Sequence, residues 1–448
     1  MRSAVILGGG LSGAAAAASL ARSGYGKVTV VERGPELGGL AGTFEQNGHF
    51  YPLAYHHILH LDRPLLYFLD QVGALPAVRW RKIRMLFNLE DQSHDLTNPL
   101  GFLRFPMSLP DKARFVLLML RCFRKVDWSD WHGRSARELI DSWAGPGVRE
   151  TVFERLCRLK FGLPSDDVSA AWLGARLNFR EGSAPLGYIP GSNWTKDLCD
   201  GLTRMVAEAD VEVLLDTTAT RLHTGQGRLT ELELADGRRL AGDTFVSTIP
   251  TEVYTRMVPG DDTPYLSAIR YTAVVSAICA TRQRVEPEFY WMNLMSLAQS
   301  ASGFFKLSSL NPSIGAPGDT CFNFMTHVPS RHDEFFKLSD DEIWEAYLAD
   351  FKQVFGFEMK PFWRHLTKLP LYSPVLVKDF ENPPLRSSTW SNLYFAGNYR
   401  TFPSTVTTGT ALHSGLEAAD AILREHGLES EMLADAANYR LGAMPRAR

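Results

Sequence analysis

The sequence has few cysteines, no large excess of either charge and no long apolar run. Its 448 residues include five cysteines, which are widely spaced and form no CxxC pair. This pattern disfavours a disulfide framework or a zinc site and is typical of a reducing compartment, so we predict a cytoplasmic protein without a metal site. With 47 basic and 50 acidic residues, the net charge of −3 gives no reason to expect nucleic acid as a partner.

Other absences exclude common classes of protein. The chain has no Walker A motif and no GxSxG in a strand–turn–helix context, so we predict neither a P-loop nucleotidase nor a serine hydrolase. No apolar run reaches the ~18 residues that a spanning helix needs, and we predict no stable membrane insertion. Residues 1–20 have the early Arg and small residues of a signal peptide, but four glycines interrupt the apolar stretch and disfavour that interpretation.

The first thirty residues carry a dinucleotide-binding pattern. Residues 3–7 predict a short buried strand, and Gly8 to Gly13 form a GxGxxG turn before an alanine-rich helix. A second β-branched strand over 27–31 ends on Glu32, nineteen residues after Gly13. The carboxylate of Glu32 can accept hydrogen bonds from the hydroxyl pair of a ribose. This order of strand, turn, helix, strand and acid predicts a Rossmann-like unit.

Each position of the turn has a physical role. Gly8 permits the tight turn, Gly10 has no Cβ and lets a pyrophosphate approach the backbone, and Gly13 lets helix and strand pack closely. The helix N-terminus, with Leu11 and Ser12, offers free N–H groups and a partial positive charge to the pyrophosphate. We therefore expect these residues to bind the phosphates of a dinucleotide.

A second glycine pair follows the acid. Arg33 opens the segment RGPELGGLAGT, in which Gly38 and Gly39 precede Leu40 and Ala41. The segment resembles the "GG" motif of the superfamily of FAD-containing amine oxidases, protoporphyrinogen oxidases and phytoene desaturases, to which UDP-galactopyranose mutases are related. The resemblance implies FAD as the cofactor, held in part by these residues. The superfamily commonly has Arg where this chain has Leu40, a departure that weakens an assignment to the amine oxidases proper.

Residues 391–419 resemble the C-terminal FAD signature of the same superfamily. A short strand ends at Gly397, and a helix with small residues near its start follows. The resemblance implies that the N-terminus of this helix, with Thr407 and Thr408, points at the isoalloxazine ring. It also implies that Asn398, which replaces an acidic residue of the family, hydrogen-bonds a ribityl hydroxyl or a phosphate.

Three weaker matches lie between the two signatures. Ala219, in a strand before an Asp-Gly hairpin turn, matches a position at which the family contacts adenine through its backbone. His56 and His57 belong to the stretch FYPLAYHHILH, which is similar to a histidine-containing stretch beside the flavin of galactopyranose mutases. We predict contact with flavin or substrate for both histidines. Structural, hydrogen-bonded histidines are the alternative.

Further candidates for catalysis come from position and residue type. Arg400, two residues after Asn398, is predicted to lie near the edge of the flavin ring, and Tyr399 is a candidate for the substrate wall. Lys306 lies on a predicted strand, and amine oxidases often have a Lys near flavin N5. Aromatic and basic residues are also common in cores and on solvated faces. The predicted catalytic residues are Arg400, His57, Lys306 and Tyr399.

The matching segments are far apart in the chain, which predicts a discontinuous domain. We predict an α/β fold: a Rossmann-like FAD-binding domain of the glutathione-reductase type with an inserted α+β substrate domain. Residues 86–204 are predicted to be mainly helical, and residues 261–384 to mix strands and a helix into a mixed sheet. The predicted boundaries are 1–85, 205–260 and 385–428 for the FAD-binding domain, 86–204 and 261–384 for the substrate domain, and 429–448 for a C-terminal tail.

The resemblance implies an FAD-dependent oxidoreductase. Flavin N5 would accept a hydride from a C–H or C–N bond of a small to medium organic substrate, and O2 or another acceptor would reoxidise the flavin. Two alternatives stay open at this point. One is a redox-neutral sugar-nucleotide mutase resembling UDP-galactopyranose mutase, and the other is a non-catalytic binding protein on the same fold.

Overall fold

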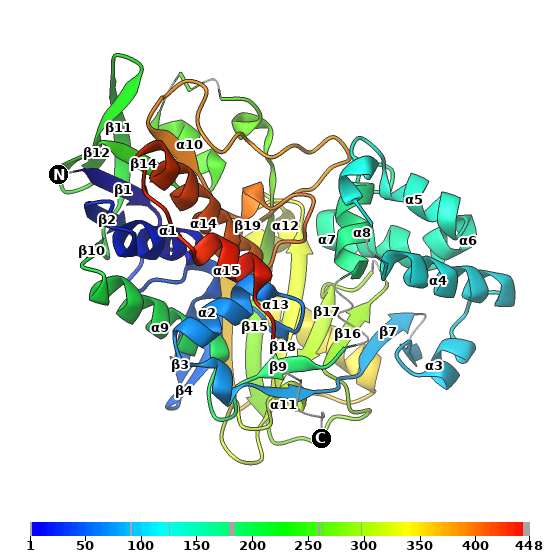
Figure 1. The fold of residues 1–448 in the computed structure, drawn as a ribbon. Helices are drawn as coiled ribbons and strands as arrows, with labels where there is room; N and C mark the ends of the chain where they lie inside the picture. The colour runs from blue at the N-terminus through cyan, green and yellow to red at the C-terminus, as the bar shows by residue number, and fades with distance from the viewer. Residues whose placement is uncertain are drawn as a thin grey trace.

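The protein consists of a parallel sheet with its helices, a large mixed sheet and a lobe of short helices (Figure 1). The fold comes from a computed structural model, which describes residues 2–89, 92–124, 126–178, 184–258, 260–261, 263–296 and 298–441. Part of the predicted C-terminal tail, residues 442–448, lies outside the described residues, as do residues 179–183 of the first predicted insertion. The domain boundaries themselves stay a prediction.

Five parallel strands form the sheet at the N-terminal end of the chain. Their order is β10 (Glu212–Leu214), β2 (Lys27–Val31), β1 (Ser3–Leu7), β14 (Thr244–Ser247) and β20 (Leu393–Phe395). β1 and β14 are almost wholly buried. Ile6 and Val246 belong to one buried cluster with the helices on one face, and Val5 and Phe245 belong to another with the strands of residues 219–234 on the other face. The predicted Rossmann-like unit is thus confirmed, and its strands come from all three predicted segments.

Two helices from opposite ends of the chain pack together beside this sheet. They are α1 (Leu11–Arg22) and α14 (Thr408–Glu425). The Ser12 hydroxyl donates to the carbonyl of Ala411 at 2.7 Å, and a Cβ built on Gly415 would lie 2.1 Å from the Ser12 carbonyl oxygen. Only glycine therefore allows this approach. α1 begins at Leu11, before the alanine run that indicated it, because the residues of the glycine turn already adopt its first turn.

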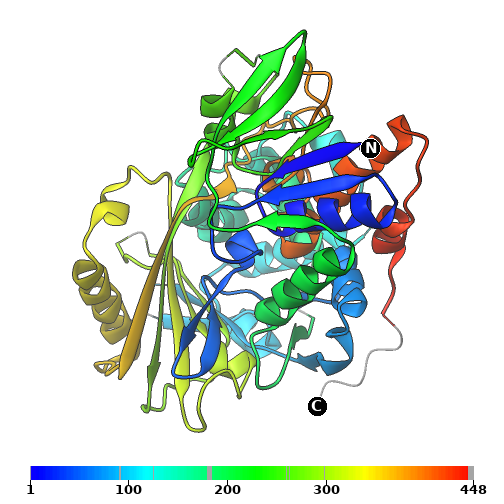
Figure 2. The same ribbon diagram turned by 90° about the vertical axis from the view of Figure 1, so that its left-hand side faces the viewer.

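A seven-stranded mixed sheet forms the second layer, and Figure 2 shows it as a sheet separate from the parallel one. Its order is β19 (Trp363–Pro374), β15 (Tyr271–Thr281), β18 (Thr320–Val328), β17 (Gly303–Lys306), β16 (Trp291–Leu294), β7 (Met85–Leu89) and β8 (Gln92–Asp95).

The predicted mixed sheet is confirmed, with one difference. Helix α13 (Asp340–Phe355) packs on its outer face, where Phe324 and Phe351 belong to one buried cluster. The difference concerns β7 and β8, which form the edge of the sheet opposite β19, although they lie in a segment predicted to be mainly helical. The strand Met85–Leu89 is a short, fully buried apolar run, and such a run has no alternation that distinguishes strand from helix.

The remaining elements complete these layers. Three smaller sheets are built from β3 (Thr43–Gln46) with β4 (His49–Pro52), from β5 (Ile58–Leu59), β9 (Leu186–Tyr188) and β6 (Arg79–Arg81), and from β11 (Ala219–Gly225), β12 (Arg228–Leu234) and β13 (Arg239–Ala241). The helical lobe contains α3 (Pro99–Arg104), α4 (Leu109–Cys122), α5 (Ala136–Trp143), α6 (Pro146–Val148), a π-helical turn (Arg149–Phe153), α7 (Glu154–Phe161) and α8 (Ala170–Asn178).

The other helices are α2 (Arg63–Gln71), α9 (Trp194–Glu208), α10 (Thr251–Met257), α11 (Leu307–Leu310), α12 (Glu334–Lys337) and α15 (Met432–Asn438). Short 3-10 turns lie at Gly39–Ala41, Leu75–Ala77, Trp128–Trp131, Leu266–Ala268 and Asn398–Arg400. Within the described ranges, none of the helices combines the length and the apolar character needed to cross a membrane.

The contact between α1 and α14 generates a first prediction. Gly415→Ala should lower the free energy of unfolding by about 1–3 kcal/mol, because the added Cβ meets a backbone oxygen that no rotamer change can move. The gain in helix propensity from the same change is smaller, at most ~1 kcal/mol. Chemical unfolding followed by circular dichroism measures the difference. Gly225→Ala is the control, since the nearest atom to its new Cβ is 3.6 Å away. Equal stability of the two variants would contradict the proposed contact.

Candidate functional site

The glycine turn forms an open cradle at the end of β1. Gly8 has φ +99°, and a Cβ on Gly13 would lie 2.0 Å from the Gly8 carbonyl oxygen, so both positions require glycine. A Cβ on Gly10 would meet no atom within 4 Å. The space beside Gly10 and the uncapped N-terminus of α1 therefore suit a phosphate group, and α1 carries no acidic residue in its first turn.

The second glycine pair folds across the first. The Gly38 N–H donates to the Gly9 carbonyl at 2.9 Å, and Gly10 and Gly38 form a parallel bridge. Gly39 has φ +57°, in the left-handed region that favours glycine. Ala41 is buried. The two loops sequence analysis identified are thus in direct contact, and Leu40, at the departure from the family pattern, is half-buried beside them.

Glu32 closes the cradle at the end of β2. Its carboxylate accepts hydrogen bonds from the N–H groups of Gly9 and Gly34, both at 2.7 Å. Each oxygen keeps a lone pair for a further donor such as a ribose hydroxyl. Arg33 beside it is exposed. The Thr217 N–H donates to the Glu32 carbonyl at 2.9 Å, so the segment leading to Ala219 runs next to this end of the cradle.

The C-terminal signature lies between the parallel sheet and the mixed sheet. Gly397 has φ +135°, and its N–H donates to the Ser414 hydroxyl at 3.0 Å. The amide of Asn398 donates to the carbonyl of Tyr372 in β19 at 3.0 Å. The hydroxyl of Tyr399 donates to the Ser247 carbonyl at 2.9 Å and is buried. The Asn398 bond thus ties the loop before α14 to the mixed sheet, and the Tyr399 bond ties it to β14 of the parallel sheet.

α14 begins with a capping box formed by Thr407 and Thr410. The Thr407 side chain accepts from the Thr410 N–H at 3.0 Å, and the Thr407 N–H donates to the Thr410 hydroxyl at 2.8 Å. Thr408 is the first residue of the helix and is half-buried. The capping box fixes where the helix N-terminus starts, which determines where its partial positive charge lies.

Asp62 is a site residue that the sequence-based predictions missed. It is 3% exposed, and its carboxylate accepts the N–H of Gly409 at 3.3 Å. A Cβ on Gly409 would lie 1.6 Å from a carboxylate oxygen of Asp62, so glycine is required there. Burial raises the pKa of Asp62 to about 6, while the Thr407 hydroxyl and the N–H groups of Gly409 and Leu65 oppose this rise. The one sequence signal is its position just before α2, which suggests an ordinary helix cap.

Tyr55 and the histidines after it connect the cradle to the mixed sheet. The Tyr55 ring stacks on Phe305 at 3.6 Å between centroids, and the His57 ring lies 5.9 Å from Tyr290 and 6.1 Å from Trp291. We call these five side chains the aromatic wall. It contains His57 and is built from three elements that sequence reasoning did not connect.

His56 has a different environment from its neighbour. Its Nδ1 lies 2.7 Å from the Ala54 carbonyl, to which it must donate, and its own carbonyl accepts from the Trp194 indole at 3.3 Å. Burial lowers the pKa of the His56 imidazole and so favours its neutral form, although the bond to the Ala54 carbonyl opposes this shift. These contacts fix the segment and its orientation.

Lys306 does not join the aromatic wall. It follows Phe305 on β17, so the alternation of the strand turns it to the opposite face of the sheet from the aromatic wall. Its ammonium forms an ion pair with Glu288 and donates to the Val285 carbonyl at 3.2 Å.

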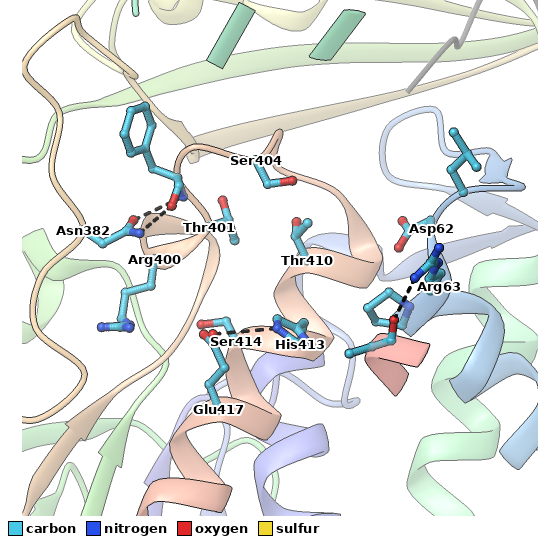
Figure 3. Close-up of a pocket in the computed structure, with 14 residues that line it drawn as sticks. Asp62, Arg63, Asn382, Arg400, Thr401, Ser404, Thr410, His413, Ser414 and Glu417 are labelled. Atoms are coloured by element: carbon cyan, nitrogen blue, oxygen red, sulfur yellow. Dashed lines mark hydrogen bonds and ion pairs between the residues drawn. The ribbon is translucent and has the colours of Figure 1, made fainter. Parts of the chain in front are cut away.

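Arg400 borders a cavity of about 340 Å3 beside α14 (Figure 3). Its guanidinium donates to the Pro383 carbonyl at 2.5 Å, and its Nε has no hydrogen-bond partner among the described residues. Asp62 and Arg63 lie on one side of the cavity in Figure 3, and Arg400 and Glu417 lie on the other. Arg400 is therefore a half-buried cation with donor capacity beside an open volume.

The position of Asp62 generates a second prediction. The folded protein holds its proton up to about pH 6, whereas the unfolded chain releases it near the ordinary value of 3.8, so ionisation destabilises the folded state as pH rises between these values. Asp62→Asn removes this loss, worth about 3 kcal/mol. The stability of the variant relative to the unsubstituted protein should therefore rise between pH 4 and pH 7, as measured by chemical unfolding. The exposed Asp130→Asn serves as the control. Parallel pH profiles for Asp62→Asn and the unsubstituted protein would exclude a raised pKa.

Comparison with known proteins gives a consistent result for the whole chain. The family model for flavin containing amine oxidoreductases matches residues 11–423. A 15-cis-phytoene desaturase of Solanum lycopersicum is 22% identical over 461 residues, which covers 95% of this chain and 78% of that one. A protoporphyrinogen-oxidase-like structure from Exiguobacterium sp. 255-15 superposes with a TM-score of 0.78 at 17% identity, covering 95% and 99% of the two chains.

A structure of reduced UDP-galactopyranose mutase also has this fold, with a TM-score of 0.73, 13% identity and coverage of 97% and 96%. The open cradle at Gly10, the acid at Glu32 and the crossing glycine loop fit a dinucleotide, and the family model supplies its identity as FAD. The protein is an FAD-dependent oxidoreductase. The chain belongs to the family of flavin-containing amine oxidoreductases.

Proposed function

We propose that the protein oxidises or desaturates a small to medium organic molecule. Bound FAD would supply the redox chemistry by accepting a hydride from a C–H or C–N bond. The observation that carries the proposal is the aromatic wall, to which the segment leading from the cradle contributes Tyr55 and His57. An apolar, ring-lined surface binds a carbon skeleton and keeps water from the reacting bond.

The composition of the wall favours oxidation over other chemistry. Its members, Tyr55, His57, Tyr290, Trp291 and Phe305, include no carboxylate and no thiol. Such a surface can orient a substrate and supplies one imidazole, so the hydride transfer itself would depend on the cofactor. The name of the tomato relative, a phytoene desaturase, is consistent with a substrate of this apolar kind.

The residues divide into those that would hold FAD and those that would contact substrate. Gly10, the N-terminus of α1 and Glu32 would bind the pyrophosphate and ribose. We propose that His57 and Arg400 contact substrate or flavin, because both border open or aromatic surfaces. Tyr399 and Lys306 have their polar groups engaged by Ser247 and Glu288, so structural roles suit them better.

The cradle gives a direct test of the cofactor position. Gly10→Val puts carbon atoms into the space beside the turn, and FAD affinity should fall by at least about 100-fold, or about 2.7 kcal/mol. The fold should be kept, since φ at Gly10 is −65° and a Cβ meets no neighbour there. Fluorescence titration of the apoprotein with FAD measures the affinity. Gly225→Val is the matched control, and a folded Gly10→Val protein with normal affinity would overturn the assignment.

The reaction class is tested by anaerobic reduction of the bound flavin. The visible band of the oxidised protein is followed with a panel of hydride donors taken from the relatives: 15-cis-phytoene, protoporphyrinogen and putrescine. We expect at least one compound of this kind to bleach the band, and His57→Phe to slow bleaching about tenfold or more. The exposed His132→Phe is the control.

The same experiment distinguishes the proposed oxidation from redox-neutral isomerisation of a sugar nucleotide. Isomerisation of UDP-galactopyranose by the pre-reduced protein, with no bleaching by any reductant in the panel, would contradict the proposed oxidation. The proposed oxidation would also be contradicted if the protein bound FAD normally but neither these compounds nor their saturated and unsaturated analogues reduced the flavin.

A further inference from the structure

The tip of the helical lobe exposes an unusual number of large apolar side chains. Eleven large hydrophobic residues are exposed in the described part of the chain, and six of them lie in α3 and α4. They are Leu100 (64% exposed), Leu103 (57%), Leu109 (72%), Val116 (43%), Leu117 (52%) and Leu120 (53%). We call this group the α3–α4 face. It lies at the far end of the molecule from the parallel sheet (Figure 1).

α4 is apolar on two sides, of which folding covers only one. Leu118 and Cys122 are fully buried and attach the helix to the lobe. Val116, Leu117 and Leu120 form a second stripe that points to solvent. The helix is otherwise well formed, since the Ser108 side chain caps it by accepting the Asp111 N–H at 3.2 Å. The exposed stripe is therefore held rigidly in place.

The α3–α4 face has a positive surround. Residues 96–126 contain six basic residues and one acidic residue, a net +5 in a chain of net −3, so the rest of the chain carries −8. Arg104, Arg121 and Arg124 are exposed, and Arg114 pairs with the single acid, Asp111, at 2.9 Å. Positive charge is thus concentrated where the apolar side chains are exposed.

We propose that the α3–α4 face docks on an anionic lipid surface. The leucines would enter the boundary between headgroups and acyl chains, and the arginines would lie at the level of the lipid phosphates. A rigid helix with an exposed apolar stripe, a cationic border and no spanning length is the pattern of an interfacial helix. The proposal does not depend on the proposed function.

Charge favours lipid over the other possible occupants. A second copy of the chain related by two-fold symmetry would bring the two positive segments together, because such an interface uses the same face on both subunits. Like charges directly opposed are unfavourable. An anionic bilayer offers apolar depth and negative charge at the same surface.

The apolar contribution is tested by co-sedimentation with vesicles of phosphatidylglycerol and phosphatidylcholine. The FAD-loaded protein should bind, and Leu117→Gln/Leu120→Gln should weaken binding by at least about tenfold, since glutamine keeps helix propensity and removes the apolar anchor. Phe362→Gln is the matched control: Phe362 is 49% exposed, close to the 52% of Leu117, but lies on another face. Binding that Leu117→Gln/Leu120→Gln leaves unchanged would overturn the proposal.

The charge contribution is tested with the same vesicles. Arg104→Gln/Arg124→Gln should weaken binding to anionic vesicles about tenfold and reduce its salt dependence. Vesicles of phosphatidylcholine alone should bind the unsubstituted protein more weakly. Equal binding to both vesicle types would contradict the role of the arginines.

Insertion is measured separately with a polarity-sensitive thiol label. All five native cysteines are buried, so a label on Ala113→Cys in α4 is selective, and Ala241→Cys on β13 is the control site. Vesicles should shift the emission of the Ala113 label to shorter wavelength and leave the Ala241 label unchanged. Absence of vesicle binding would overturn the proposal. A dimer in vesicle-free solution that Leu117→Gln/Leu120→Gln dissociates would show that a second copy of the chain covers this face instead.

Discussion

The close contact between α1 and α14 is the constraint on which the rest of the site depends. Gly415 lets the backbone of α14 reach the first turn of α1, and Ser12 bonds to Ala411 across the contact. The glycine turn comes from the first residues of the chain and the C-terminal signature from the last sixty. Without this packing the glycine turn and the C-terminal signature would not meet beside the parallel sheet.

Close packing around this contact explains why glycines are concentrated here. At Gly13, Gly409 and Gly415 a Cβ would lie within about 2 Å of an oxygen atom, so each glycine serves close packing. At Gly10 the opposite holds, because nothing in the protein occupies the space next to it. Three glycines bring protein groups together and one leaves room for a ligand.

The aromatic wall is assembled from the mixed sheet and one connecting segment. Tyr55 stacks on β17 while Asn398 bonds to β19, so both flavin-related segments contact strands of the same sheet. Buried Asp62 adds a titratable group at the N-terminus of α14. The helical lobe follows β8, at the edge of the mixed sheet opposite β19. It carries the α3–α4 face, so the surface proposed to bind lipid lies apart from the aromatic wall.

The sequence by itself determined the Rossmann-like unit, the need for glycine at Gly8 and Gly13, and the joining of both chain ends in one FAD-binding fold. These features depend on short-range patterns, in which turn, helix and strand follow one another within thirty residues. It did not determine the aromatic wall, the strand Met85–Leu89 in the mixed sheet, or the partner of Asp62. Those features join residues up to about 350 positions apart, as Asp62 and Gly409 are. Only tertiary packing decides such pairs. Burial, and the close approach that a glycine allows, depend on both surfaces in contact, so neither segment shows them as a periodic pattern in its sequence.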